Sequence, residues 1–274
     1  MKLESLFEQS HRMPSIPKVV QELIDSFSDE NVDLDTIGSK VAMDQVITAK
    51  VLRLANSARF GLPRQVTSAN DAVVLLGFNA LRTLVLASGV TGAFEDTEGL
   101  KKAEFWSNSF SVATIAKMIA QKSTVELNPE TAFTCGMLHN VGELLLHVVA
   151  PEEMQMVTKA IAAGGARQAT QRSILAIDYT EVGAELARLW RFPEEIQEAI
   201  AQQIDPLSED EVSSLACVVN LALYTSRRLN AQEGDYQEPI PEDLVKVLGV
   251  DIEALLADEE AIREAASTFD SLVS

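Results

Sequence analysis

Apolar residues recur at helical spacing along almost the whole chain, and this pattern limits the fold more than any other feature. One stripe runs through Ile16, Val20, Leu23 and Phe27, where each residue follows the last by three or four positions. Such spacing places apolar side chains on one face of a helix. No segment shows the period of two that is expected of a half-buried strand. The chain is therefore predicted to be all-α.

The predicted helices fall into two groups. Five short helices with short joints are predicted over residues 1–95, an arrangement typical of a helical bundle. A polar stretch at 92–104 separates them from a longer helix that starts at Phe105. We therefore expect an N-terminal five-helix subdomain over 1–95 and a second helical bundle, with C-terminal helices, over 96–274.

Composition narrows the classes of protein and of partner. Hydrophobic residues make up 47% of the chain and charged residues 23%, as in a globular protein with a large core. The formal net charge of −19 opposes contact with a phosphate backbone, so nucleic acid is not an expected partner. Neither a signal peptide nor a membrane span is evident, which predicts a cytoplasmic protein without membrane contact. Cys135 and Cys217 lie far apart in apolar contexts and are expected to be buried free thiols.

Three histidines are the first candidates for metal or acid–base chemistry. His11 lies in a polar segment without an evident partner. His147 lies on an apolar helix, where a hydrogen-bonded core histidine is the simpler interpretation. His139 is different, because it stands at a predicted helix end and is followed by Asn140 and, two residues later, by Gly142.

The segment His139-Asn140-Val141-Gly142 resembles the signature of the HD superfamily of metal-dependent phosphohydrolases, in which His-Asp is followed by a hydrophobic residue and a glycine. The resemblance implies a metal held by the His-Asp pair and by a distant His and Asp, which would activate water for attack on a phosphoester. Here Asn140 stands in place of the Asp, and an amide has no charge to offset that of a cation.

The rest of the implied ligand set is also missing. At the positions of the superfamily's histidines stand Asn108, Tyr179, Gln202 and Gln203, and near its final Asp stands Leu223. Of these positions, only His139 still carries the residue type of the implied ligand set. The resemblance therefore implies a degenerate pocket with no metal, no other cofactor and no catalytic residue.

Several segments of the N-terminal half resemble, in order, the HDOD domain (the HD-related output domain). They are 13–17, 44–57, 61–63, 66–68 and 72–82. With the second half, the resemblance spans about 10–250 and implies an N-terminal helical bundle followed by an HD/PDEase-like helical bundle. The family's members are mostly bacterial, and they carry names of the signal-transduction or metal-dependent phosphohydrolase type. Most lack a complete metal site and are regarded as regulatory.

Each candidate site has a structural alternative. Arg53, Asn56 and Arg82 are candidate binding residues, but Asn56 can equally end a helix by bonding local backbone. His139 and Asn140 can be a polar relic that holds neighbouring helices together through hydrogen bonds.

The preferred hypothesis is a non-catalytic signal-transduction module, a pseudo-enzyme whose partners are signalling proteins. One alternative is an atypical phosphohydrolase built on His139, with carboxylates drawn from Glu143, Asp178 and Glu181. Another is a sensor that binds a nucleotide in the degenerate pocket without turnover.

Overall fold

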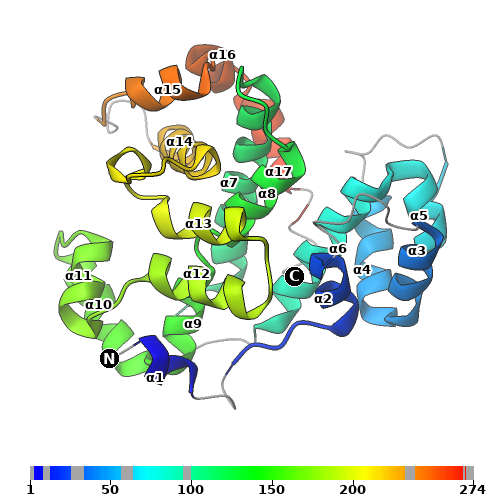
Figure 1. Cartoon of the computed structure of the whole chain (residues 1–274), viewed down its shortest axis with the longest axis horizontal. Coiled ribbons are helices and arrows are strands. Elements are labelled where there is room, and N and C mark those ends of the chain that lie inside the picture. The colour runs from blue at the N-terminus through cyan, green and yellow to red at the C-terminus, as the bar shows by residue number, and fades with distance from the viewer. Residues whose placement is uncertain are drawn as a thin grey trace.

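A computed structural model describes residues 3–8, 13–25, 34–56, 64–94, 100–231 and 238–267, together with Phe269. Within these ranges the chain is helical apart from turns and loops, and no strand is present, so the predicted all-α class is confirmed (Figure 1). The helices are α1 (Leu3–Phe7), α2 (Lys18–Asp25), α3 (Leu34–Met43), α4 (Gln45–Ala55), α5 (Ala69–Leu76), α6 (Phe78–Ala93), α7 (Lys102–Lys122), α8 (Pro129–Leu138), α9 (Val141–Val149), α10 (Pro151–Ala162), α11 (Arg167–Leu175), α12 (Tyr179–Leu189), α13 (Glu194–Gln202), the 3₁₀ helix η4 (Pro206–Ser208), α14 (Ser214–Asn230), α15 (Glu242–Leu248), α16 (Ile252–Ala257) and α17 (Glu259–Ser267).

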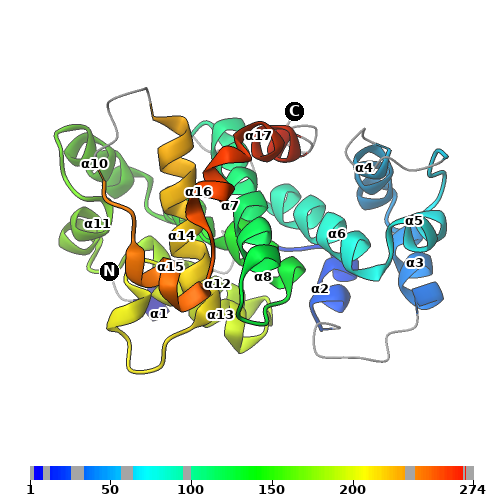
Figure 2. The same cartoon turned by 90° about the horizontal axis from the view of Figure 1, so that it is seen from above.

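Helices α2 to α6 form an N-terminal unit. Capping residues set two of their starts: the Asp44 carboxylate accepts hydrogen bonds at the start of α4, and the Ser68 hydroxyl does the same for α5. Gly77, with a φ of 81°, separates α5 from α6 in a conformation that favours glycine. Helix α1 lies away from this unit, on the opposite side of the molecule (Figures 1 and 2).

Helix α7 is the centre of the second unit, where it packs against α8, α14 and α17. Close packing with α8 depends on Gly136, because a Cβ there would lie 2.6 Å from the Cα of Ala113. At the other side, Phe269 stacks on Phe110 with ring centroids 4.5 Å apart. Helix α12 in turn packs against α9 and α13.

The two units meet along α2 and α6. Figure 2 shows α6 reaching from the α2–α5 group toward α8, and its Thr83 donates a hydrogen bond to Glu130 of α8 at 2.6 Å. Trp190 accepts a hydrogen bond from Gln21 at its carbonyl oxygen (2.8 Å) and donates one from Nε1 to the carbonyl of Pro14 (3.3 Å). The ring of Phe94 also packs edge-on against Trp190. Aromatic packing and a few hydrogen bonds thus join the units.

One stretch, Pro129–Val149, is long and apolar enough to cross a membrane by length and composition. The chain divides it at His139 and Asn140 into α8 and α9, and most of it is buried inside the fold. It therefore forms core. Cys135 and Cys217 are buried free thiols, as predicted.

Gly142 allows α9 and α12 to approach each other. A Cβ at this position would lie 2.0 Å from the carbonyl oxygen of Tyr179 and 2.5 Å from the amide nitrogen of Gly183. Both atoms belong to backbone, which cannot move aside as a side chain can. The glycine of the His-Asn-Val-Gly segment is thus required by packing.

We predict that Gly142→Ala lowers the free energy of unfolding by about 3 kcal/mol, because it forces two helix backbones apart. Gly92→Ala is the matched control, since the nearest atom to its Cβ is Lys50 Nζ at 3.7 Å. In this control the free energy of unfolding should stay unchanged or rise by up to about 1 kcal/mol, because alanine has the higher helix propensity. Urea denaturation of both variants measures the difference, and equal effects would contradict the packing argument.

Candidate functional site

The candidate site lies where α8 passes into α9. His139 ends α8 and Asn140 precedes the first residue of α9, so both side chains sit in a joint between buried helices. The close contact at Gly142 brings the start of α12, and with it Tyr179, to the same place. Helix α11 covers this joint through Arg167 and Gln171, which contact residues of α9.

Arg167 is the centre of the site. Its Nη2 donates a hydrogen bond to Oδ1 of Asn140 and lies 2.9 Å from Oε2 of Glu143, while its Nε donates to the same carboxylate oxygen at 3.2 Å. Its guanidinium also lies over the ring of Tyr179, 3.9 Å from the centroid. Asn140 and Tyr179, the two residues that we predicted at metal-ligand positions of the superfamily, therefore both contact one positively charged side chain.

Glu143 is the charge that this arrangement satisfies, and its side chain is only 12% exposed. Its carboxylate also accepts a hydrogen bond from Gln171 Nε2, and its Oε1 lies 3.7 Å from Nε2 of His147. Burial alone would raise the pKa of Glu143, but the His147 contact, the charge of Arg167 and the hydrogen bonds together lower it to about 2. Glu143 is therefore ionised at neutral pH and is fully engaged by its neighbours.

The other carboxylates near the site are engaged by the same helix. Arg172 of α11 pairs with Asp178 at 2.7 Å and with Glu181 at 3.1 Å. Asp178 caps α12 by accepting hydrogen bonds from the amides of Thr180 and Glu181. All three carboxylates proposed for an atypical hydrolase are thus paired with arginines of α11.

His139 is buried and neutral. Its Nδ1 lies 2.6 Å from the carbonyl oxygen of Gly136, which can only accept, so Nδ1 carries the proton and Nε2 keeps its lone pair. Burial is the main reason that the pKa of His139 falls to about 4. Gln203, also buried, donates from Nε2 to the main-chain carbonyls of His139 and Ile200 and so ties α13 to the joint.

The remaining predicted pocket residues do not converge on His139. Asn108 is exposed on α7, and Leu223 is half-buried on α14. The side chain of Gln202 accepts a hydrogen bond from the amide of Ser213, which precedes α14, and not from a residue of the joint. The structure thus brings together His139, Asn140, Tyr179 and Gln203, and leaves Asn108, Gln202 and Leu223 outside this set.

The donor set does not fit a metal ion. Within the described part of the chain, no group of three or more His, Cys, Asp or Glu side chains is placed to hold one. A metal ion beside His139 would share its surroundings with the Arg167 guanidinium and be repelled by it. The Oδ1 of Asn140 and the Oε2 of Glu143 already contact that guanidinium, and Asp178 and Glu181 pair with Arg172.

The candidate binding residues of the N-terminal unit have separate surroundings. Asn56 accepts a hydrogen bond from the amide of Val66 and donates to the carbonyls of Val66 and Leu52, which is the helix-ending role considered above. Arg53 is exposed on α4, whereas Arg82 is buried on α6 over the ring of Phe78. A binding role for the three stays a prediction.

Sequence reasoning missed Arg167, Gln171 and Arg172. They lie 24 or more residues from Asn140 and Glu143 in the chain, and only the turn between α10 and α11 returns them to the joint. The available signal was the spacing of Arg167 and Gln171, which puts both side chains on one face of a helix.

Comparison with known proteins agrees with this geometry. The family model of the HDOD domain matches residues 13–206. The fold and the HD-like joint thus define a helical HDOD-type protein, and this chain belongs to the HDOD domain family.

Two solved structures illustrate the similarity. The chain is 32% identical to the "Putative phosphohydrolase" of Shewanella amazonensis SB2B, with a TM-score of 0.84 and coverage of 98% of both chains. It is 21% identical to the "Putative signal transduction protein" of Marinobacter aquaeolei VT8, with a TM-score of 0.79, over 97% of this chain and 61% of that one. At that identity the second likeness concerns the fold alone.

A curated relative from Treponema pallidum (strain Nichols), described as "Uncharacterized protein", is 24% identical over 269 residues. The match covers 97% of this chain, which spans about half (51%) of the relative's length.

We predict that Arg167→Met lowers the free energy of unfolding by about 2 kcal/mol, because it leaves the Glu143 carboxylate buried without its charge partner. Arg188→Met is the matched control, since Arg188 pairs with Glu185 on the exposed surface of α12. This control should lower the free energy of unfolding by less than about 1 kcal/mol, because the pair is exposed to solvent. Thermal and urea unfolding of both variants measure the difference, and a neutral Arg167→Met would contradict the role given to Arg167.

A second prediction concerns pH. The pKa of His139 is lowered from 6.5 to about 4 in the folded chain, so between these values the unfolded chain binds more protons. The folded state is therefore destabilised relative to the unfolded state as pH falls from about 6.5 toward 4, by about 2 kcal/mol at about pH 4.5. Glu143, with a folded pKa of about 2, loses its contribution only below 4.5.

Urea unfolding of the wild-type chain between pH 7 and 4.5 measures this decrease in the free energy of unfolding. The decrease should be smaller in His139→Gln, which lacks the titrating ring. NMR titration of His139 in the folded protein provides an independent check. A midpoint near its ordinary pKa would contradict the prediction.

Proposed function

We propose that this chain is a non-catalytic signal-transduction module that acts through contacts with protein partners. The observation that carries the proposal is the position of Arg167, which donates to Asn140 and Glu143 and covers Tyr179. A positively charged side chain thus stands among the residues that the superfamily uses for a metal ion. The same hydrogen bonds stabilise the joint between α8, α9 and α12.

Phosphoester hydrolysis in this superfamily requires an activated water, and nothing in the joint is arranged to produce one. His139 is neutral but buried, with Nδ1 engaged by Gly136. The nearby carboxylates are paired with arginines, and the pKa values of Glu143 and Asp178 are lowered in the folded chain. The phosphohydrolase name of a structural relative does not transfer an activity, because fold alone does not determine chemistry.

The interface between the two units suits a signalling role. It combines aromatic packing of Phe94 on Trp190 with hydrogen bonds such as Gln21 to Trp190 and Thr83 to Glu130. Small helix shifts at an interface of this kind are a common way to switch between two states. We therefore assign the signal-dependent movement to the α2–α6 side of this interface.

Hydrolysis assays test the non-catalytic part of the proposal. We expect no turnover of a panel of nucleotides, cyclic dinucleotides and phosphodiesters above the level of His139→Ala, with and without added Mn²⁺. Turnover that is present in the wild-type protein and disappears in His139→Ala would overturn the proposal in favour of an atypical phosphohydrolase.

Co-purification tests the partner-binding part. The full chain is expected to retain the same signalling protein in independent preparations from its source cells, whereas an unrelated protein of similar negative charge retains none. Repeated failure to retain any specific protein would count against the module hypothesis even if hydrolysis is absent.

A further inference from the structure

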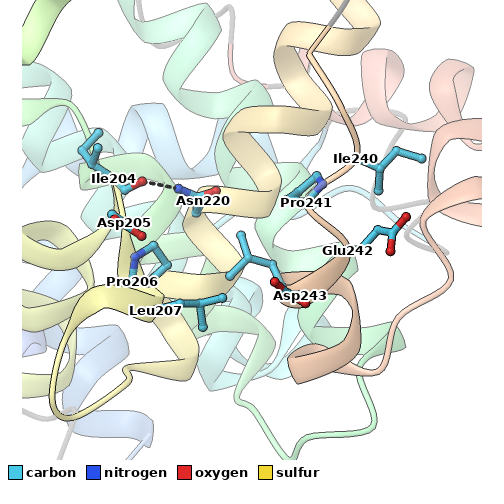
Figure 3. A pocket seen from close by; sticks show the side chains of 10 residues that line it. Ile204, Asp205, Pro206, Leu207, Asn220, Ile240, Pro241, Glu242 and Asp243 are labelled. Carbon is cyan, nitrogen blue, oxygen red and sulfur yellow. Dashed lines mark hydrogen bonds between the residues drawn. The ribbon is translucent and has the colours of Figure 1, made fainter.

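A groove lies on the second unit between η4, α14 and the start of α15 (Figure 3). Its volume is about 510 Å³. The helices that form it lie on the side of the molecule away from α2–α6 (Figure 1). We call it the η4–α15 groove. The residues of the HD-like joint do not line this groove. Asn220, which does line it, is hydrogen-bonded to Gln203 of the joint, as described below.

Apolar side chains form two sides of the groove. Ile204 and Leu207 line one side and Ile240 the other, and each of them is between 37% and 39% exposed. Leu244 lies behind them and is only 5% exposed. Branched side chains left partly open around a concave space are the usual lining of a site for an apolar side chain of a ligand.

Carboxylates surround this apolar lining. Asp205, Glu242 and Asp243 line the groove and are exposed. Lys246 lies within 3.5 Å of Asp243 and 3.9 Å of Glu242, but all three side chains are at least 70% exposed, so these pairs hold weakly in water. A cation from another molecule can replace Lys246 there at little cost.

Asn220 adds a fixed acceptor. Its Nδ2 donates to the main-chain carbonyls of Gln203 and Ile204, both at 2.8 Å, which uses both amide hydrogens and sets the orientation of the side chain. Its Oδ1 has no hydrogen-bond partner among the described residues, and the side chain lines the groove (Figure 3). At this point the described residues of the groove present an amide acceptor and negative charge.

We propose that the η4–α15 groove binds a basic segment of a protein partner, in which a Lys or Arg side chain lies next to a branched apolar residue. The cation reaches Asn220 Oδ1 and the surrounding carboxylates, and the apolar residue packs between Leu207 and Ile240. Charge complementarity selects this occupant, because a phosphate-bearing ligand or an anionic membrane surface is repelled by the same carboxylates. The inference rests on the proposed function and identifies the surface and the chemistry of the partner.

The groove is connected to the HD-like joint. Asn220 binds the carbonyl of Gln203, and the side chain of Gln203 donates to the carbonyl of His139. A ligand that pulls on Asn220 therefore acts on the segment that holds α13 against the joint. This gives partner binding a physical route to the helices beside the interface of the two units.

Peptide selection on the full-length chain tests the proposal. A random dodecapeptide display library is the probe, and the affinities of enriched peptides are measured by fluorescence anisotropy. The test variant is Glu242→Gln with Asp243→Asn. The matched control is Glu152→Gln with Glu153→Gln, which removes two exposed carboxylates from the equivalent first turn of α10 after a proline.

We expect enriched peptides to carry Lys or Arg beside Leu, Ile or Val, and to bind the test variant at least about tenfold more weakly than the wild-type chain. The control should change affinity by less than about twofold, because screening limits the effect of distant charges. Ile240→Ser should also weaken binding. Hydrogen exchange should then slow in 204–207 and 240–244 when peptide is added.

Three results would overturn the proposal: no enriched peptide, enriched peptides without basic residues, or equal loss of affinity in the test variant and the control. Peptides that bind with protection elsewhere would relocate the docking surface and leave the proposed signalling function intact. Hydrolysis that depends on His139 would instead reject that function, whatever the peptides do.

Discussion

A carboxylate that is removed from water needs a positive charge or several hydrogen-bond donors beside it. This requirement explains why residues of α11 pack against Glu143 of α9. The side chain of Glu143 on α9 is only 12% exposed, and an ionised group without partners in such surroundings would cost several kcal/mol. Arg167 supplies the charge and Gln171 a further donor. Both come from α11, so this interaction helps to hold that helix over Asn140 and Tyr179, together with the pairs of Arg172 with Asp178 and Glu181.

The contact between α9 and α12 is set by backbone packing at Gly142. Gly142 holds α9 against α12 through backbone contact, a requirement that persists whether or not a metal is bound. In the same joint, Asn140 and Tyr179 are partners of the Arg167 guanidinium. Under the proposed function, these contacts keep the helices in place without a metal ion.

The sequence predicts some of this well and some of it not at all. The helical spacing of Ile16 to Phe27 is a local feature, and such stripes along the chain predict an all-α fold. The sequence also shows Asn140 and Tyr179 at positions where the resemblance implies metal ligands. The part played by Arg167 is not, because it depends on how α10 and α11 turn back toward α9. For the same reason the exposed position of Asn108 and the η4–α15 groove appear only in three dimensions.

The metal content of the protein tests the central claim most directly. The full chain is purified without chelator and without a metal-affinity tag, and Mn, Fe, Zn and Ni are measured by mass spectrometry. If Arg167 has taken the place of the metal ion, each metal will be present at less than about a tenth of an equivalent. Near-stoichiometric metal in the wild-type protein that is lost in His139→Ala would contradict the account.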